Sequence, residues 1–157
     1  MVNCFENKND REFYNNKFNK DFYDFIKNNS DKSWDWMYLS QNGNITMDII
    51  EKYTDKAWNW TYLSMNCNIT MDIIENHPDK PWNWSYISMN PNITMEFINK
   101  HIDKGWDWYW ISCNSGISMD MIENNLDKPW DWNGISINRN VTIEFIENHI
   151  DKAWNWN

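Results

Sequence analysis

Residues 79–102 read DKPWNWSYISMNPNITMEFINKHI, and the same pattern recurs along most of the chain. Its most regular element, W-D/N-W, recurs every 24 residues without insertion or deletion, beginning at Trp34, Trp58, Trp82, Trp106, Trp130 and Trp154. Five full repeats span 31–54, 55–78, 79–102, 103–126 and 127–150, and 151–157 begins a sixth. Self-similarity at such a period is typical of a solenoid, in which each repeat packs against its neighbours.

Each repeat is expected to hold two short helices joined by a turn. The second helix should follow the Thr or Ser of N-I-T-M-D/E, whose hydroxyl can cap it, namely Thr46, Thr70, Thr94, Ser118 or Thr142. The first helix should begin at the Asp of D-K-x-W, such as Asp79, and end near the Ser-x-Asn segment. Pro81 and Pro129 would then lie in its first turn, where proline is tolerated. The predicted fold is all-α, a solenoid of 24-residue helix-turn-helix repeats.

A leucine-rich-repeat-like α/β solenoid is the alternative, because its repeats have similar lengths. Trp60, Leu63, Met65 and Asn68 loosely follow the pattern L-x-x-L-x-L-x-x-N. The match fails at Thr70, where that pattern requires an apolar residue. Short apolar segments do not separate strand from helix by periodicity alone, so both architectures stay open, with the helical one preferred.

The two tryptophans of each repeat predict how the stack is held together. Residues two apart on a helix are separated by roughly 200°, so both indoles cannot share one face. In a stack, the first can pack against the preceding repeat and the second against the following one. The predicted structural ladder consists of Trp34, Trp36, Trp58, Trp60, Trp82, Trp84, Trp106, Trp108, Trp130 and Trp132.

Residues outside the full repeats are predicted to close the array. Residues 1–30 are expected to form an N-terminal cap, in which 21–30 is a degenerate half-repeat. Residues 151–157 are either a minimal C-terminal cap or a truncated repeat, through which copies of the chain could self-associate.

Composition excludes several classes of partner. The chain has 157 residues and a net charge of −9, and its arginines are Arg11 and Arg139, which opposes binding to nucleic acid or to anionic membranes. The N-terminus has no apolar signal-peptide region, and no apolar run reaches the ~20 residues of a membrane span. Three widely spaced cysteines fit a reducing compartment, so an intracellular, non-secreted protein is expected.

No arrangement of residues predicts catalysis, a metal or a cofactor. His77, His101 and His149 share one repeat position, and equivalent side chains in a stack lie about 10 Å apart, too far to share an ion. Equivalent acids recur in nearly every repeat, which indicates a solvated face: Asp48, Glu51, Asp72, Glu75, Asp120, Glu123, Glu144 and Glu147. No glycine-rich phosphate loop is present. We therefore expect no enzyme activity.

The variable positions of the repeat predict where a partner binds. Positions 7 and 8 of the repeat, counted with the opening Asp as position 1, supply aromatic residues that could form an outward stripe: Tyr38, Tyr62, Tyr86, Tyr109 and Trp110. Tyr and Trp are favoured anchors at protein interfaces, so a non-enzymatic protein-interaction scaffold is the predicted function. The same aromatics could instead stack on single-stranded bases or on sugars, or they could belong to the core.

The segment DKPWNW…ISMNPNITME of residues 79–96 resembles tryptophan-rich tandem repeats in proteins of giant DNA viruses of amoebae and algae. The resemblance extends over 31–157. It implies a viral protein that acts in the host cytoplasm or is packaged in the virion, and it carries over no catalytic residue.

Overall fold

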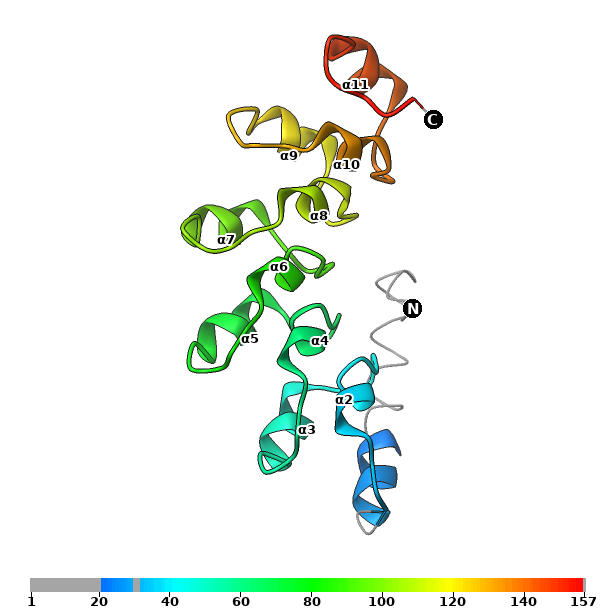
Figure 1. Ribbon diagram of the computed structural model, residues 1–157, viewed down its shortest axis with the longest axis vertical. Coiled ribbons are helices and arrows are strands. Elements are labelled where there is room, and N and C mark those ends of the chain that lie inside the picture. The colour runs from blue at the N-terminus through cyan, green and yellow to red at the C-terminus, as the bar shows by residue number, and fades with distance from the viewer. Residues whose placement is uncertain (1–20, 30–31, 157) are drawn as a thin grey trace. The chain divides into compact units, whose positions relative to one another are not determined.

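The computed structural model describes residues 21–29 and 32–156, which fold as a series of short helices joined by turns (Figure 1). No strand occurs within these residues. The predicted all-α helical repeat is therefore confirmed, and the leucine-rich-repeat alternative lacks its strand in the described part of the chain. The chain divides into two compact units, an N-terminal unit that ends at Trp82 and a C-terminal unit that starts at Asn83.

One helix of each repeat begins at the second tryptophan of W-D/N-W. In the N-terminal unit these first helices are α2 (Trp36–Leu39) and α4 (Trp60–Ser64). In the C-terminal unit they are α6 (Trp84–Ile87), α8 (Trp108–Cys113) and α10 (Trp132–Ser136). Before the first repeat, residues 21–28 are helical, and the predicted cap at 1–20 lies outside the described residues.

The second helices begin one residue after the Thr or Ser of each repeat, as predicted. They are α3 (Met47–Lys52), α5 (Met71–Asn76), α7 (Met95–Lys100), α9 (Met119–Glu123) and α11 (Ile143–Asn148). Four hydroxyls accept a hydrogen bond from the backbone N–H three residues on, those of Thr70, Thr94, Ser118 and Thr142. Thr46 holds the same extended cap conformation without a side-chain bond. The predicted N-caps of the second helices are confirmed in position.

The predicted start of the first helix is wrong. Its N-cap is the residue between the two tryptophans, which is Asp35, Asn59, Asn83, Asp107 or Asp131. The helix does not start at the Asp of D-K-x-W, because a tight turn separates that residue from the helix. In this turn the N–H of Trp82 donates to the carbonyl of Lys80 at 2.8 Å. Pro81 and Pro129 lie in these turns, outside any helix.

Aliphatic side chains from both helices of a repeat and from the turn between them form the core. In the second repeat, Leu63 of α4 and Ile69 of the turn are fully buried, and Ile74 of α5 is 3 % exposed. The corresponding Ile111, Ile117 and Ile122 of the fourth repeat are all 0 % exposed. No single repeat encloses such residues by itself, so packing between repeats supplies the core.

Candidate protein-interaction surface

The first tryptophan of each repeat closes the end of the preceding second helix. Its indole Nε1 donates to the backbone carbonyl five residues earlier, which is that of His77 for Trp82 and of His149 for Trp154, both at 2.8 Å. The same bond recurs from Trp34, Trp58, Trp106 and Trp130. Carbonyls at a helix C-terminus have no partner within the helix, so this indole is held by a structural hydrogen bond.

The second tryptophan meets the first tryptophan of the next repeat edge to face. In the N-terminal unit the ring centroids lie 4.9 Å apart for Trp36 and Trp58 and 5.0 Å apart for Trp60 and Trp82. In the C-terminal unit the pairs are Trp84–Trp106, Trp108–Trp130 and Trp132–Trp154, at 5.2, 5.3 and 5.2 Å. The first tryptophan of each repeat precedes the first helix, whereas the second begins it. The two indoles of a repeat therefore point to different neighbours because of the turn between them and not because of rotation along a helix.

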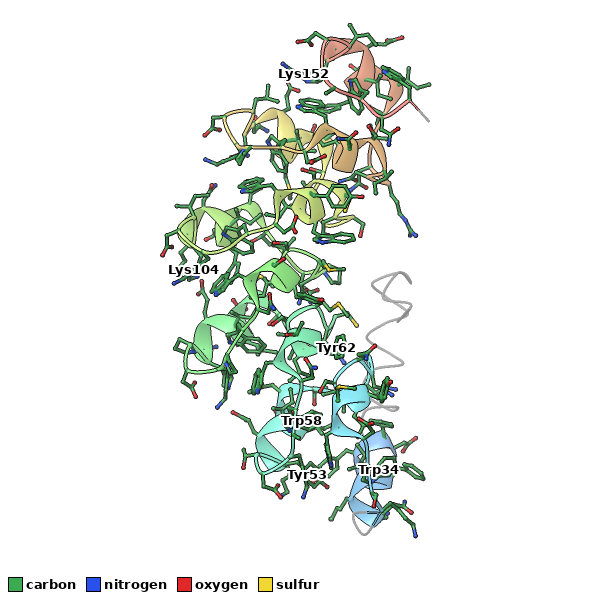
Figure 2. The ribbon with its side chains drawn as sticks, viewed as in Figure 1. Trp34, Tyr53, Trp58, Tyr62, Lys104 and Lys152 are labelled. Atoms are coloured by element: carbon green, nitrogen blue, oxygen red, sulfur yellow. The ribbon has the colours of Figure 1, made fainter. Side chains whose placement is uncertain are left out.

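Three of the lysines in the opening Asp-Lys pairs lie over the second tryptophan of the preceding repeat, and Figure 2 labels two of them, Lys104 and Lys152. The ammonium groups of Lys56, Lys104 and Lys152 lie 5.9, 5.7 and 5.9 Å from the ring centroids of Trp36, Trp84 and Trp132. Each Lys also pairs with the Asp before it, over 2.7 Å in the second repeat. The hydrogen bond from Lys56 lowers the pKa of Asp55. Cations already occupy the faces of these second tryptophans.

Buried serine and asparagine side chains join neighbouring repeats. The hydroxyl of Ser88 donates to the carbonyl of Trp84 and accepts from the N–H of Asp107 in the next repeat. Asn114 donates through Nδ2 to the carbonyls of Ser88 and Asn90, one repeat earlier. These contacts explain why this Ser and this Asn occur in every full repeat. Their partners in the neighbouring repeat lie 19 to 26 residues away, so these contacts could not be predicted from local sequence.

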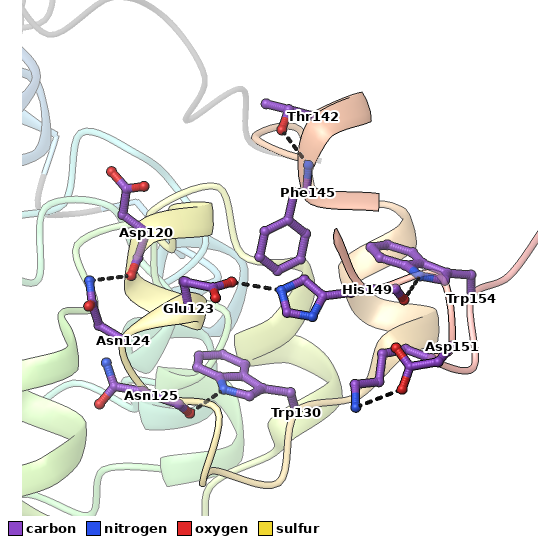
Figure 3. A network of polar contacts seen from close by, with 11 residues as sticks. Asp120, Glu123, Asn124, Asn125, Trp130, Thr142, Phe145, His149, Asp151 and Trp154 are labelled. Carbon is purple, nitrogen blue, oxygen red and sulfur yellow. Dashed lines mark hydrogen bonds and ion pairs between the residues drawn. The ribbon is translucent and has the colours of Figure 1, made fainter. Parts of the chain in front are cut away.

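Two histidines, His77 and His149, each contact a glutamate of the preceding second helix. Nε2 of His149 lies 2.7 Å from Oε2 of Glu123, and the His149 ring packs against Phe145 with centroids 4.6 Å apart (Figure 3). His77 approaches Glu51 at 3.0 Å and the carbonyl of Ile73 at 2.8 Å. The bond to Ile73, followed by that to Glu51, raises the pKa of His77. Within the described residues, no group of three or more His, Cys, Asp or Glu could hold a metal ion.

The aromatic residues predicted to bind a partner are not buried. We use the name aromatic edge for the set Tyr38 and Tyr62 of the N-terminal unit and Tyr86, Tyr109 and Trp110 of the C-terminal unit. Tyr38 of α2 is 65 % exposed, and Tyr109 and Trp110 of α8 are 38 % and 37 % exposed. Tyr62 of α4 and Tyr86 of α6 are half-buried. Two further exposed apolar residues lie at variable positions of the repeat. Met37 belongs to α2, and Ile137 directly follows α10.

Gly134 in the fifth repeat interrupts the aromatic edge for a steric reason. A Cβ on Gly134 would lie 2.8 Å from the carbonyl oxygen of Tyr109 and 2.9 Å from Cβ of Ser112. Real Cβ atoms do not approach other heavy atoms so closely, so glycine lets α10 pack directly on α8. The edge within the C-terminal unit therefore ends on the Tyr109–Trp110 pair.

Comparison with known proteins identifies no relative from which a function could be inferred. The chain matches no protein-family model, no curated protein and no solved structure. Within the described residues, no helix combines the length and the apolar character needed to cross a bilayer.

Proposed function

We propose that the chain is a non-enzymatic repeat scaffold that binds a protein partner through the aromatic edge. The support is a contrast between two groups of aromatic residues. The ladder tryptophans are engaged with each other, with helix carbonyls and with lysines, whereas Tyr38, Tyr109 and Trp110 are exposed. Exposed Tyr and Trp on a rigid element provide large contact area at little entropic cost. The resemblance to giant-virus repeats makes the host cytoplasm or the virion the proposed setting.

The charge along the aromatic edge favours protein over nucleic acid. The first helices and the turns that follow them span 35–44, 59–68, 83–92, 107–116 and 131–140. Together they contain no Lys and a single Arg, Arg139, against Asp35, Asp107 and Asp131. Single-strand readers combine stacking aromatics with an electropositive groove that follows the phosphates. Such a groove would require basic residues that these segments lack.

The test is a pull-down from host-cell lysate with the intact chain and with a variant carrying Tyr38→Ser, Tyr109→Ser and Trp110→Ser. A matched control carries Ile102→Ser, Leu126→Ser and Ile150→Ser, which removes apolar side chains that are 51 %, 46 % and 63 % exposed elsewhere. Circular dichroism verifies that both variants fold. Proteins captured by the intact chain and the control, but lost with the edge variant, are the expected result. Identical captures by all three chains contradict the proposal, and recovered RNA would favour a nucleic-acid reader.

Self-association is a second candidate, favoured by one contrast in burial. Ile143 of α11 is 75 % exposed, whereas the methionines at its repeat position are 6 to 9 % exposed, namely Met47, Met71, Met95 and Met119. Trp156 is 68 % exposed as well. We expect the sedimentation coefficient to rise with concentration for the intact chain and to stay constant for an Ile143→Ser, Trp156→Ser variant. A constant value for the intact chain would rule this interface out.

A further inference from the structure

Tyr109 and Trp110 form the best-defined part of the aromatic edge. Their rings meet at 74° with centroids 5.1 Å apart, and both side chains are more than a third exposed. They occupy the first turn of α8, directly after its N-cap Asp107. Oδ1 of Asp107 accepts hydrogen bonds from the backbone N–H of Tyr109 and of Trp110, at 3.1 and 3.2 Å. One carboxylate is thereby fixed at the base of both aromatic side chains.

A second carboxylate is held against the same helix. The backbone N–H of Asp131 donates to the hydroxyl of Ser112 in α8 at 2.9 Å, and Oδ1 of Asp131 caps α10 through the N–H of Gly134. Burial, together with the charges of Asp107 and Asp131, raises the pKa of the Cys113 thiol in α8. Asp107 is therefore held at the first turn of α8 and Asp131 next to Ser112 of the same helix, in which Cys113 donates to the carbonyl of Trp110.

Aromatic faces combined with carboxylates recognise a particular chemistry. A guanidinium or ammonium group is attracted by the ring quadrupole and gains further from a nearby carboxylate. Elsewhere in this molecule the same attraction already operates, since Lys104 lies 5.7 Å from the ring centroid of Trp84. The segments that carry the aromatic edge contain no Lys and one Arg, Arg139, in the turn after α10.

We propose that Tyr109, Trp110, Asp107 and Asp131 form a patch that binds a basic side chain of a partner, so that the partner segment is an arginine- or lysine-containing peptide. This inference rests on the proposed function, because it identifies the chemistry of what docks on the aromatic edge. Arginine is the better fit, since its planar guanidinium stacks on an aromatic ring and bonds a carboxylate at the same time.

Other repeats of the chain show how the charge of these Asp residues can be removed without losing the helix cap, because they carry Asn at the same position. The residue between the tryptophans is Asp in some repeats and Asn in others, and Asn59 caps α4 by accepting a hydrogen bond from the N–H three residues on, at 3.1 Å. Asp107→Asn with Asp131→Asn should therefore remove both charges and keep both caps. The control variant, Asp120→Asn with Glu144→Gln, loses the same net charge from the exposed first turns of α9 and α11.

The probe is a fluorescein-labelled, end-blocked peptide of alternating Arg and Ala, compared with the same peptide carrying Gln for each Arg. Fluorescence anisotropy at two salt concentrations measures binding to the full chain. We expect the Arg peptide to bind the intact chain and the control variant alike. Affinity should fall about tenfold for Asp107→Asn with Asp131→Asn and for Tyr109→Ser with Trp110→Ser. Added salt should weaken the binding that remains.

Equal binding of the Arg and Gln peptides, or equal affinity of the Asn pair and the intact chain, would overturn the inference. The lysate experiment separates this failure from that of the proposed function. Partners that are lost with the aromatic-edge variant but retained by the Asn pair would leave the scaffold function standing without its basic ligand. Partners unaffected by either variant would remove both.

Discussion

Asn138 shows what a single buried polar side chain contributes to this repeat array. It is 1 % exposed, and its Nδ2 donates to the carbonyls of Ser112 and Asn114 at 2.8 and 3.0 Å. Asn138→Ala would remove the donor to the carbonyl of Ser112 and one of the two donors to the carbonyl of Asn114, which also accepts from the N–H of Ile117. Losing these buried hydrogen bonds should cost about 3 kcal/mol of unfolding free energy. Urea unfolding measures the loss. Asn133→Ala, at an exposed position of the same repeat, should change stability little, and equal effects of the two would contradict the role of Asn138.

His77 predicts how stability depends on pH. Its pKa is raised in the folded chain, chiefly by the carbonyl of Ile73 and then by Glu51. This stabilisation is fully present below the unfolded pKa of about 6.5 and is lost as pH rises through the folded pKa. His77→Asn should abolish the contribution, because Asn125 at this repeat position makes the equivalent backbone bond at 2.8 Å without titrating. Urea midpoints between pH 6 and 8 test this, and parallel pH profiles for the two chains would refute it.

At the scale of the helix, the residue between the tryptophans decides where the first helix starts. Asp131 caps α10, whereas Asp127 is an exposed partner of Lys128. Asp131→Ala should therefore destabilise the chain by about 1 kcal/mol, and Asp127→Ala should leave the urea midpoint essentially unchanged. A larger loss of stability for Asp127→Ala than for Asp131→Ala would instead favour Asp127, the Asp of D-K-x-W, as the N-cap of the first helix.

That assignment also marks the limit of what the sequence predicts about these helices. Asp79 and Asn83 are both good capping residues, and α6 has four residues, too few for apolar periodicity to choose between them. The tight turn at Trp82 places the start of the helix after Asn83, and the backbone hydrogen bond that closes this turn cannot be predicted from residue types. The second helices were predictable, because Thr94 precedes a clear amphipathic segment.

The candidate site was predictable to a similar extent. Repetition at fixed spacing identified the aromatic edge, but the exposed fraction of each member depends on neighbours. Tyr38 is 65 % exposed while Tyr62, at the same repeat position, is half-buried. That Asp107 and Asp131 cap α8 and α10 was not predicted, because the change between Asp and Asn at this repeat position does not reveal where the side chain lies. Only packing between successive repeats supplies that information.

At the scale of the whole molecule, the contacts within each of the two units join successive repeats, so stability should be local rather than uniform. Trp130 illustrates this, because it bonds to the carbonyl of Asn125 and packs on Trp108, both within the C-terminal unit. Trp130→Leu should speed amide exchange in α8 to α11 and leave α3 and α4 protected. Hydrogen exchange followed by mass spectrometry resolves these segments.

Trp58→Leu in the N-terminal unit is the matched test of that locality, because Trp58 makes the corresponding bond to Tyr53 and the corresponding ring contact with Trp36. Its effect should be the reverse, with faster exchange in α2 to α5 and protection retained in α9 to α11. An equal rise in exchange along the whole chain for both variants would mean that the array unfolds as one cooperative block. Nearest-neighbour contacts would then be insufficient to describe its stability.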